Sequence, residues 1–290
     1  MTLPPFDLHR PRSLEEATEL LDRYGDDAAA YCGGTELLLL LKLRLASFGH
    51  LVDLKGIEEL RGVQRDDGAV AVGAAVAHRE LERSPVVREL LPALASMERR
   101  VANVRVRHVG TLGGNVCFAD PRSDPTTFLL ALDAELECRR GGATPRRIGA
   151  RDFFLGPYQT ALAAGEILTS VRIPVPPPGA TIVHEKFAFY ERPSATVTCL
   201  LRGQGGEVAD ARIAVGSVGP RPTRARDAER RLLGAPFSAL DEGESVEEVA
   251  TLAAEACGAV DDATGSADYK ANLVRVLVTR SIRRAIRTAA

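Results

Sequence analysis

Two glycine-rich segments far apart in the sequence are the clearest candidates for chemistry. The first is Cys32-Gly33-Gly34-Thr35-Glu36, and the second is Gly110-Thr111-Leu112-Gly113-Gly114-Asn115. Adjacent glycines allow positive φ angles and leave backbone N–H groups bare, and both properties suit close approach to phosphate oxygens. Either segment alone could be an ordinary glycine-rich turn. Together they predict a dinucleotide clamp.

Neither segment matches the common nucleotide-binding patterns. The chain has no Gly-x-Gly-x-x-Gly fingerprint and no Gly-x-x-x-x-Gly-Lys-Ser/Thr phosphate loop at either place. A nicotinamide or ATP site of the usual kind is therefore not expected. The five histidines stand alone in the sequence, so no catalytic acid or base pair is predicted. His108 lies beside the second segment, and we expect it to order that loop through a hydrogen bond.

Composition favours a small-molecule protein over a binder of charged polymers. The 290 residues are 45% hydrophobic, and 37 basic against 39 acidic residues leave a formal net charge of −2. This balance argues against broad binding to nucleic acid or to anionic lipid. The start has no signal-like pattern and the longest apolar run is too short to span a bilayer, so we expect a cytoplasmic protein. Five scattered cysteines indicate reduced thiols and no metal site.

The elements around the first segment follow from local patterns. Ser13-Leu-Glu-Glu16 is a capping box that predicts a helix to Tyr24. Residues 28–31 predict a strand that ends at the first glycine loop. A helix over 37–44 follows that loop, which would place its amides at the positive end of a helix. A strand over 50–54 then completes a unit near residue 55.

The rest of the chain predicts an α+β fold with a break at Pro174-Val-Pro-Pro-Pro-Gly179, because prolines at this density exclude a helix or central strand. Before the break we expect strands at 69–76, 134–138 and 166–173, and helices at 79–82, 86–101 and 125–132. After it we expect strands at 186–190, 196–201 and 211–215, and helices at 223–233, 246–256 and 268–287.

Beyond periodicity, these residues carry a resemblance that runs nearly from end to end. The chain is similar to the FAD-binding medium subunits of molybdenum hydroxylases, the family of carbon monoxide, xanthine and nicotine dehydrogenases. The matching segments are Phe6-Asp-Leu-His-Arg-Pro-Arg-Ser-Leu-Glu-Glu-Ala17, Gly33-Gly-Thr-Glu-Leu37, His50-Leu-Val-Asp-Leu54, Arg107-His-Val-Gly-Thr-Leu-Gly-Gly-Asn115 with Ser123-Asp124-Pro125, and the helix from Asp268 to Arg280.

The resemblance implies a fold and a role. The fold is the FAD-binding fold of the vanillyl-alcohol-oxidase (PCMH) type, with sub-domains at 1–55 and 56–175 that hold a non-covalent FAD, and a C-terminal α+β domain at 180–290 of the CO dehydrogenase flavoprotein type. In such enzymes a large molybdenum-cofactor subunit oxidises the substrate. A small subunit passes the electrons through [2Fe-2S] clusters to FAD on the medium subunit, which delivers them to an external acceptor. The resemblance also implies a dimer of heterotrimers.

The resemblance assigns cofactor contacts to individual residues of this chain. Backbone amides and hydroxyls around the pyrophosphate and ribityl chain would come from Cys32, Gly33, Gly34, Thr35, Glu36, Leu37, Thr111, Gly113, Gly114 and Asn115. Asp124 would accept hydrogen bonds from sugar or ribityl hydroxyls, although an Asx turn before Pro125 is the alternative. Val101 and Leu168 would add apolar contacts or ordinary core. Lys186 would place a cation near the flavin, or be an exposed strand lysine.

The chain departs from the family pattern in two places. Arg192-Pro-Ser-Ala-Thr196 stands where many relatives have Gly-Asp-Tyr, or another bulky residue, against the flavin face, so Ser194 would leave that face more open. Residues 101–107 also differ from the usual Pro-Gln before Ile-Arg-Asn. Three hypotheses follow: an electron-transfer subunit of a molybdenum hydroxylase, a stand-alone FAD oxidase or dehydrogenase, and a flavin-binding assembly protein without catalysis.

Overall fold

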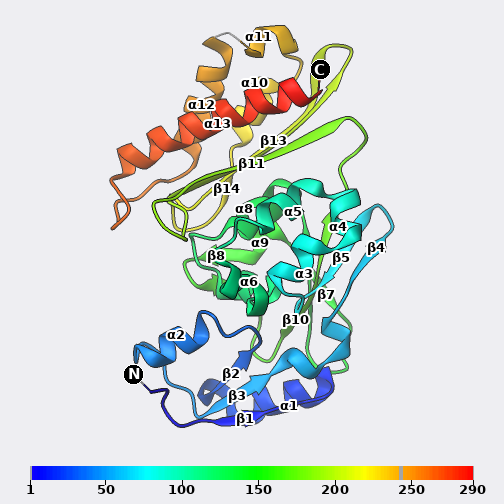
Figure 1. The fold of residues 1–290 in the computed structure, drawn as a ribbon, viewed down its shortest axis with the longest axis vertical. Coiled ribbons are helices and arrows are strands. Elements are labelled where there is room, and N and C mark those ends of the chain that lie inside the picture. Colours follow the sequence, from blue (N-terminus) through cyan, green and yellow to red (C-terminus); the bar gives the residue numbers. More distant parts are fainter. Residues whose placement is uncertain (1, 242–243, 290) are drawn as a thin grey trace. The chain divides into compact units, whose positions relative to one another are not determined.

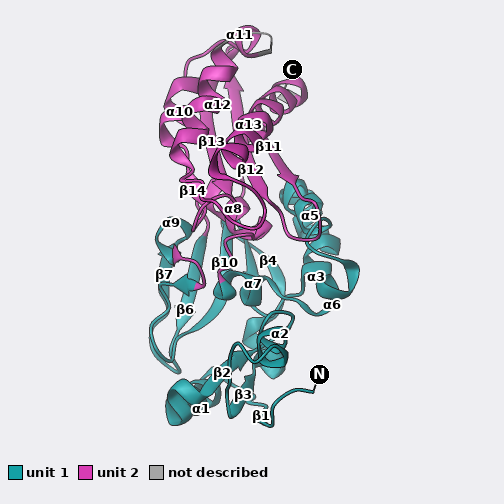
Figure 2. Cartoon of the chain, turned by 90° about the vertical axis from the view of Figure 1, so that its left-hand side faces the viewer, with its two compact units in different colours: residues 1–118, 135–153, 159–173 teal, residues 119–134, 154–158, 174–290 magenta. Residues whose placement is uncertain are grey.

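The chain folds into two units, each with its own sheets and core. The computed structural model describes residues 2–241 and 244–289. Unit 1 contains residues 1–118, 135–153 and 159–173, and unit 2 contains residues 119–134, 154–158 and 174–290 (teal and magenta in Figure 2). The mixture of helices and strands along the chain confirms the α+β class (Figure 1).

The start of unit 1 is a small parallel sheet that leads into the first glycine loop. Its strands are β1 (Asp7–His9), β2 (Ala28–Tyr31) and β3 (His50–Asp53), in the order β1-β3-β2. Helix α1 (Leu14–Tyr24) begins at the predicted cap, where the Ser13 side chain accepts a hydrogen bond from the Glu16 N–H at 3.1 Å. Helix α2 (Leu37–Lys42) ends before Arg44, which adopts a φ of 60°.

The second sheet of unit 1 has the order β4-β5-β10-β6-β7. Its strands are β4 (Val63–Asp66), β5 (Ala69–Gly73), β6 (Glu135–Arg139), β7 (Arg146–Gly149) and β10 (Ile167–Pro174), and the unit also contains α3 (His78–Arg83), α4 (Pro85–Leu90), α5 (Pro92–Glu98), α6 (Val104–Val109), α7 (Leu112–Phe118) and α9 (Ala150–Phe153). The single helix expected over 86–101 is wrong. It is divided into α4 and α5 because Pro92, which has no N–H to donate, begins a new helix.

Unit 2 is an antiparallel sheet packed against helices. The sheet order is β11-β12-β13-β14, with β11 (Ala180–Phe187), β12 (Ala195–Gln204), β13 (Glu207–Gly216) and β14 (Thr223–Arg224). The helices are α8 (Asp124–Ala131), α10 (Arg226–Leu232), α11 (Phe237–Asp241), α12 (Glu244–Ala256) and α13 (Ala267–Ala289), and the short strands β8 (Phe154–Gly156) and β9 (Gln159–Thr160) lie between α9 and β10 in the sequence. The strand expected over 186–190 ends at Phe187 and begins earlier, at Ala180.

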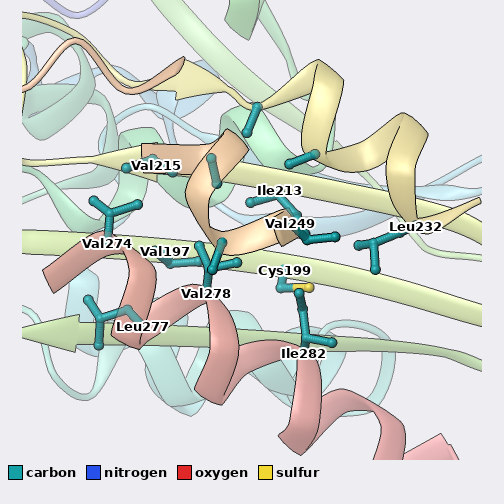
Figure 3. Close-up of a cluster of buried hydrophobic side chains, with 14 of the residues drawn as sticks. Val197, Cys199, Ile213, Val215, Leu232, Val249, Val274, Leu277, Val278 and Ile282 are labelled. Carbon is teal, nitrogen blue, oxygen red and sulfur yellow. The ribbon is translucent and has the colours of Figure 1, made fainter. Parts of the chain in front are cut away.

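The two faces of the unit 2 sheet have different roles, and the alternation of side chains along β12 separates them. Val197 and Cys199 belong to a buried cluster that includes Val274 and Val278 of α13 (Figure 3). The intervening side chains lie on the opposite face, where Thr196 hydrogen-bonds to Thr127 of α8 at 2.9 Å. One face therefore builds the core, and the other carries buried polar groups against α8.

The three-domain division expected from the sequence, at 1–55, 56–175 and 180–290, stays a prediction. The two sheets of unit 1 lie on either side of its first boundary. Residues 119–134 pack with unit 2 although they precede the proline-rich segment. Helix α8 explains why residues 119–134 belong to unit 2, because Leu130 and Ala131 bury their side chains against Ala214 of β13.

Candidate functional site

The first glycine loop joins β2 to α2 and is anchored by a lysine. The Nζ atom of Lys55 donates to the carbonyl oxygen of Cys32 at 3.0 Å, pairs with Asp53 Oδ1 at 2.8 Å and lies 3.9 Å from the centre of the Tyr31 ring. A peptide unit is planar and trans, so a fixed Cys32 carbonyl also fixes the direction of the Gly33 N–H, which points the opposite way. Lys55 was not singled out from the sequence.

The structure brings the two glycine segments into direct contact within unit 1. A Cβ atom at Gly33 would lie 2.3 Å from the Val109 carbonyl oxygen and 2.7 Å from the Gly110 Cα. A Cβ at Gly110 would lie 3.5 Å from Thr35 Oγ1. Backbone therefore touches backbone here, and only glycine at position 33 permits that approach.

The second segment forms the start of a helix, which differs from the glycine loop expected from the sequence. Helix α6 ends at Gly110, and α7 begins at Leu112 and includes Gly113, Gly114 and Asn115. The buried Thr111 hydroxyl accepts a hydrogen bond from the Gly114 N–H at 3.0 Å, as a helix cap does. This cap offsets the low helix propensity of the glycine pair.

Close packing also explains Gly113, the first glycine of the pair in the second segment. A Cβ at Gly113 would lie 2.5 Å from the Ala74 carbonyl oxygen, and the Gly113 N–H donates to that same oxygen at 3.0 Å. The Cys32 thiol faces Thr111 across the contact between the segments. Burial raises the pKa of Cys32, and a hydrogen bond with Thr111 and the charge of Lys55 oppose that rise. Cys32 is therefore a neutral thiol that packs between the two segments.

The predicted apolar contacts, Val101 and Leu168, are both buried in unit 1. Val101 is 6% exposed and follows α5, and Leu168 is 3% exposed on β10, opposite Cys138. The Val101 carbonyl oxygen accepts a hydrogen bond from Arg107 Nη1 at 2.9 Å. This arginine fixes the turn between α5 and α6, and so the approach to the second segment.

In unit 2 the structure brings Asp124 and Lys186 together and adds a histidine. Asp124 Oδ2 accepts a hydrogen bond from Lys186 Nζ at 2.9 Å, and Asp124 Oδ1 lies 3.2 Å from His184 Nε2. His184 Nδ1 in turn lies 2.8 Å from Thr198 Oγ1. The side chains of Asp124 and His184 are 4% and 2% exposed. We call Asp124, His184, Lys186 and Thr198 the unit 2 polar cluster.

Sequence reasoning missed His184, although a signal was present. His184 and Lys186 are two residues apart on β11, so their side chains share one face of the sheet. The Asx turn considered for Asp124 is replaced by a different cap, because the Ser123 side chain accepts the Thr126 N–H at 3.4 Å. The side chain of Asp124, the first residue of α8, instead makes hydrogen bonds within the unit 2 polar cluster.

The charge of Asp124 is set by this cluster. Burial alone would raise the pKa of the Asp124 carboxyl, but hydrogen bonds and charges from His184 and Lys186 outweigh it, and the pKa lies below its ordinary value. The carboxylate is therefore ionised at neutral pH, and it pairs with the Lys186 ammonium.

This lowered pKa predicts an acid-dependent loss of stability. A carboxyl whose pKa is lower in the folded state contributes stability above its unfolded value, and that stability is lost as pH falls through the folded value, below about pH 4. Thermal unfolding between pH 3 and 7 should show a steeper fall for the wild type than for Asp124→Asn. Superimposable pH profiles for the two proteins would contradict the expectation.

The segment expected at the flavin face, residues 192–196, does not expose Ser194 as the sequence suggested. Ser194 is 2% exposed, and its N–H donates to the Phe187 carbonyl oxygen at 2.8 Å. Arg192 pairs with the buried Asp120. The exposed aromatic residues of this connection are Phe189 and Tyr190, at 62% and 91%. The buried Ser194 is therefore part of the strand connection, and aromatic surface lies beside it in the sequence.

The histidine that contacts the second glycine segment is His78, whereas His108 is exposed. The His78 N–H donates to the Gly110 carbonyl oxygen at 3.0 Å. Among the described residues no group of three or more His, Cys, Asp and Glu side chains could hold a metal ion. No helix in that part of the chain has the length and apolarity needed to cross a membrane.

The residues present fit a dinucleotide with a diphosphate. In the first segment, Gly33 and Gly34 each have a peptide N–H that no side chain of their own residue covers, whereas the N–H groups of Gly113 and Gly114 donate to the Ala74 carbonyl oxygen and to Thr111 Oγ1. A Cβ at Gly114 would meet only Thr111 Oγ1 within 4 Å, at 2.9 Å. The chemistry of the donors is the chemistry that phosphate oxygens require.

Comparisons with known proteins agree with this geometry. Residues 4–176 match the family model described as the FAD binding domain in molybdopterin dehydrogenase, and residues 193–285 match the CO dehydrogenase flavoprotein C-terminal domain. The carbon monoxide dehydrogenase medium chain of Hydrogenophaga pseudoflava is 34% identical over 97% of this chain and 97% of its own length. The caffeine dehydrogenase subunit beta of Pseudomonas sp. (strain CBB1) is 31% identical over 97% of this chain and 94% of its own.

Solved structures match over the same extent. The CO dehydrogenase from Hydrogenophaga pseudoflava that lacks the Mo-pyranopterin moiety of the molybdenum cofactor aligns with a TM-score of 0.94 and 34% identity, covering 100% of both chains. Quinoline 2-oxidoreductase from Pseudomonas putida 86 aligns with a TM-score of 0.92 and 32% identity over 100% of this chain and 99% of that chain. The two sequence relatives are named as chains or subunits, which fits one component of a larger enzyme and not a stand-alone oxidase.

Proposed function

This chain belongs to the FAD-binding medium subunits of the molybdenum hydroxylase family, and we propose that it collects electrons on FAD and delivers them to an external acceptor. The electrons would come from [2Fe-2S] clusters on a small partner subunit, after oxidation of the substrate on a large molybdenum-cofactor subunit. FAD supplies the electron transfer itself, and the protein supplies binding, orientation and electrostatics. Substrate choice would then be a property of the large subunit.

The contact between the two glycine segments is the observation that carries this proposal. We assign the diphosphate and ribityl contacts to the backbone of residues 32–37 and 111–115, where Gly33 lies against Val109 and Gly110. The Lys55 ammonium fixes the Cys32 carbonyl, and the Thr111 hydroxyl fixes the Gly114 N–H. The Gly114 N–H is used within the helix cap, so the donor that this anchoring directs is the Gly33 N–H, which needs no reorganisation when an anion binds and so favours tight, non-covalent binding.

The unit 2 polar cluster is assigned a role in the electrostatics of the flavin. Asp124 holds Lys186 by an ion pair, and His184 holds Asp124 from the other side. The ionised Asp124 accepts a hydrogen bond from Lys186 Nζ at 2.9 Å. We propose that this cation favours negative charge on the flavin and that Asp124 accepts hydrogen bonds from cofactor hydroxyls.

The assembly we propose is a heterotrimer of small, medium and large subunits that forms a dimer in the cytoplasm. Support comes from relatives that carry subunit names and match this chain over nearly its whole length. The chain's near-neutral net charge of −2 supports partners other than nucleic acid.

The diphosphate assignment predicts a preference between flavins. The separately produced chain should bind FAD at least about tenfold more tightly than FMN, since charge-assisted hydrogen bonds to the diphosphate would be reduced for the monophosphate. Quenching of flavin fluorescence during titration of the apo-protein measures both affinities. Equal affinities for FAD and FMN would show that the glycine segments do not hold a diphosphate, and no binding of either would contradict the proposed function.

A further inference from the structure

His78 and Glu98 form a buried pair next to the second glycine segment. This pair belongs neither to the cofactor assignments nor to the unit 2 polar cluster. His78 Nδ1 and Glu98 Oε2 lie 2.7 Å apart, and their side chains are 3% and 0% exposed. His78 begins α3 and Glu98 ends α5, twenty residues later in the chain. Glu98 Oε1 is buried, and no hydrogen-bond partner for it lies in the described part of the chain.

Such a pair is an expensive way to fill a core. Removing a carboxylate from water costs free energy that only good pairing returns, and an apolar residue of similar size often gives equal or greater stability. Glu98 Oε1 makes no hydrogen bond in the described part of the chain that would offset the free energy lost on its removal from water. A stabilising role alone therefore accounts poorly for Glu98.

The pair is connected directly to the cofactor segments. The chain from Ala74 to His78 runs beside the second segment, with hydrogen bonds from Leu112 N to Val76 O at 3.0 Å and from Gly113 N to Ala74 O at 3.0 Å. An isolated β-bridge joins Ala77 to Thr111. His78 completes the series, since its N–H donates to the Gly110 carbonyl oxygen at 3.0 Å.

The imidazole ring itself also contacts the segment. A Cβ at Gly110 would lie 3.4 Å from His78 Cδ2 and 3.5 Å from Thr35 Oγ1 of the first segment, so Gly110 lies between the two. A change in the position of the His78 ring would thus reach Gly110, and through Gly110 the backbone contact with Gly33. Glu98 holds the ring through the hydrogen bond between Glu98 Oε2 and His78 Nδ1, at 2.7 Å.

We propose that the Glu98–His78 pair is a positioning device that fixes the contact between the two glycine segments and so increases FAD affinity. The pair would act through the glycine segments and would not itself contact the cofactor. This inference rests on the proposed function, since it needs FAD to bind at the two segments.

The test separates positioning from stability with two substitutions at one residue. Glu98→Gln keeps an acceptor for His78, whereas Glu98→Leu removes it and fills the same apolar space. Replacing both residues, as in His78→Leu/Glu98→Leu, should leave the melting temperature of the apo-protein equal to or above that of wild type, whereas Glu98→Leu leaves His78 buried without its partner and should melt lower. The dissociation constant of Glu98→Leu for FAD, from fluorescence quenching, should rise about tenfold, while Glu98→Gln stays within about threefold of wild type.

Two further proteins complete the experiment. Glu229→Gln changes another buried carboxylate, which pairs with Arg224 in unit 2 at 2.5 Å, and should lower the melting temperature without changing FAD affinity. If Glu98→Leu does not fold, His78→Leu/Glu98→Leu leaves no buried polar group at the pair and should show the same loss of affinity. Wild-type affinity in whichever of these two variants folds overturns the inference. A wild-type chain that does not bind FAD overturns the proposed function instead, and the inference with it.

Discussion

Replacing Gly33 with alanine should remove FAD from the purified protein. The added Cβ would lie 2.3 Å from the Val109 carbonyl oxygen, and both that oxygen and the neighbouring Gly110 Cα are backbone atoms that cannot rotate away. The two glycine segments would have to separate. Forced overpacking of this kind costs about 1–3 kcal/mol, so the FAD dissociation constant should rise by up to about a hundredfold. Absorbance of the purified protein and titration of the apo-form with FAD measure the loss.

Gly149→Ala is the matched control for this variant. Gly149 ends β7, has no positive φ, and a Cβ there would meet no atom within 4 Å. The control should retain the wild-type flavin content, and circular dichroism of both apo-proteins should confirm equal folding. Full flavin content in Gly33→Ala would mean that the contact between the segments is not needed for binding.

Replacing Asp124 with alanine should destabilise unit 2, because Lys186 loses its ion-pair partner. The substitution leaves the buried His184 and the largely buried Lys186 without their shared carboxylate. Breaking a buried ion pair from one side costs about 3–5 kcal/mol, which corresponds to a fall in melting temperature of about 10 °C for a chain of this size. Differential scanning calorimetry measures the shift.

A surface ion pair provides the comparison for Asp124. Glu248 and Arg231 lie 2.7 Å apart, but their side chains are 54% and 43% exposed. Exposed pairs contribute about 0–1 kcal/mol, so Glu248→Ala should leave the melting temperature nearly unchanged. Similar melting temperatures for Asp124→Ala and Glu248→Ala would show that the unit 2 polar cluster is not the stabilising network described here.

The sequence predicts elements best where a local signal is complete. Ser13 and Glu16 define the start of α1, because a capping box is contained in four residues. The helix expected over 86–101 fails at Pro92, where the chain restarts a helix without interrupting the apolar pattern. The glycine pair at 113–114 hides the start of α7, since the Thr111 cap outweighs the propensity of glycine.

The site is predictable to the extent that it consists of backbone. Both glycine segments can be identified from the sequence, because glycine is the residue that permits close approach. The side chains that hold the segments in place cannot be identified in this way. Lys55 is 23 residues from Cys32, and Glu98 is 20 from His78. Such pairs become visible only when the fold places β3 beside β2 and α5 beside α3.

Purification of the tagged chain from its native host would show whether the chain is one subunit of a molybdenum hydroxylase. FAD, iron and molybdenum should elute together with this chain and two further polypeptides, identified by acid release of the flavin, metal analysis and mass spectrometry. A single yellow chain with FAD and no metal after gentle handling would contradict the proposed electron-transfer subunit. A colourless chain with neither flavin nor partners would contradict the assignment of the two glycine segments.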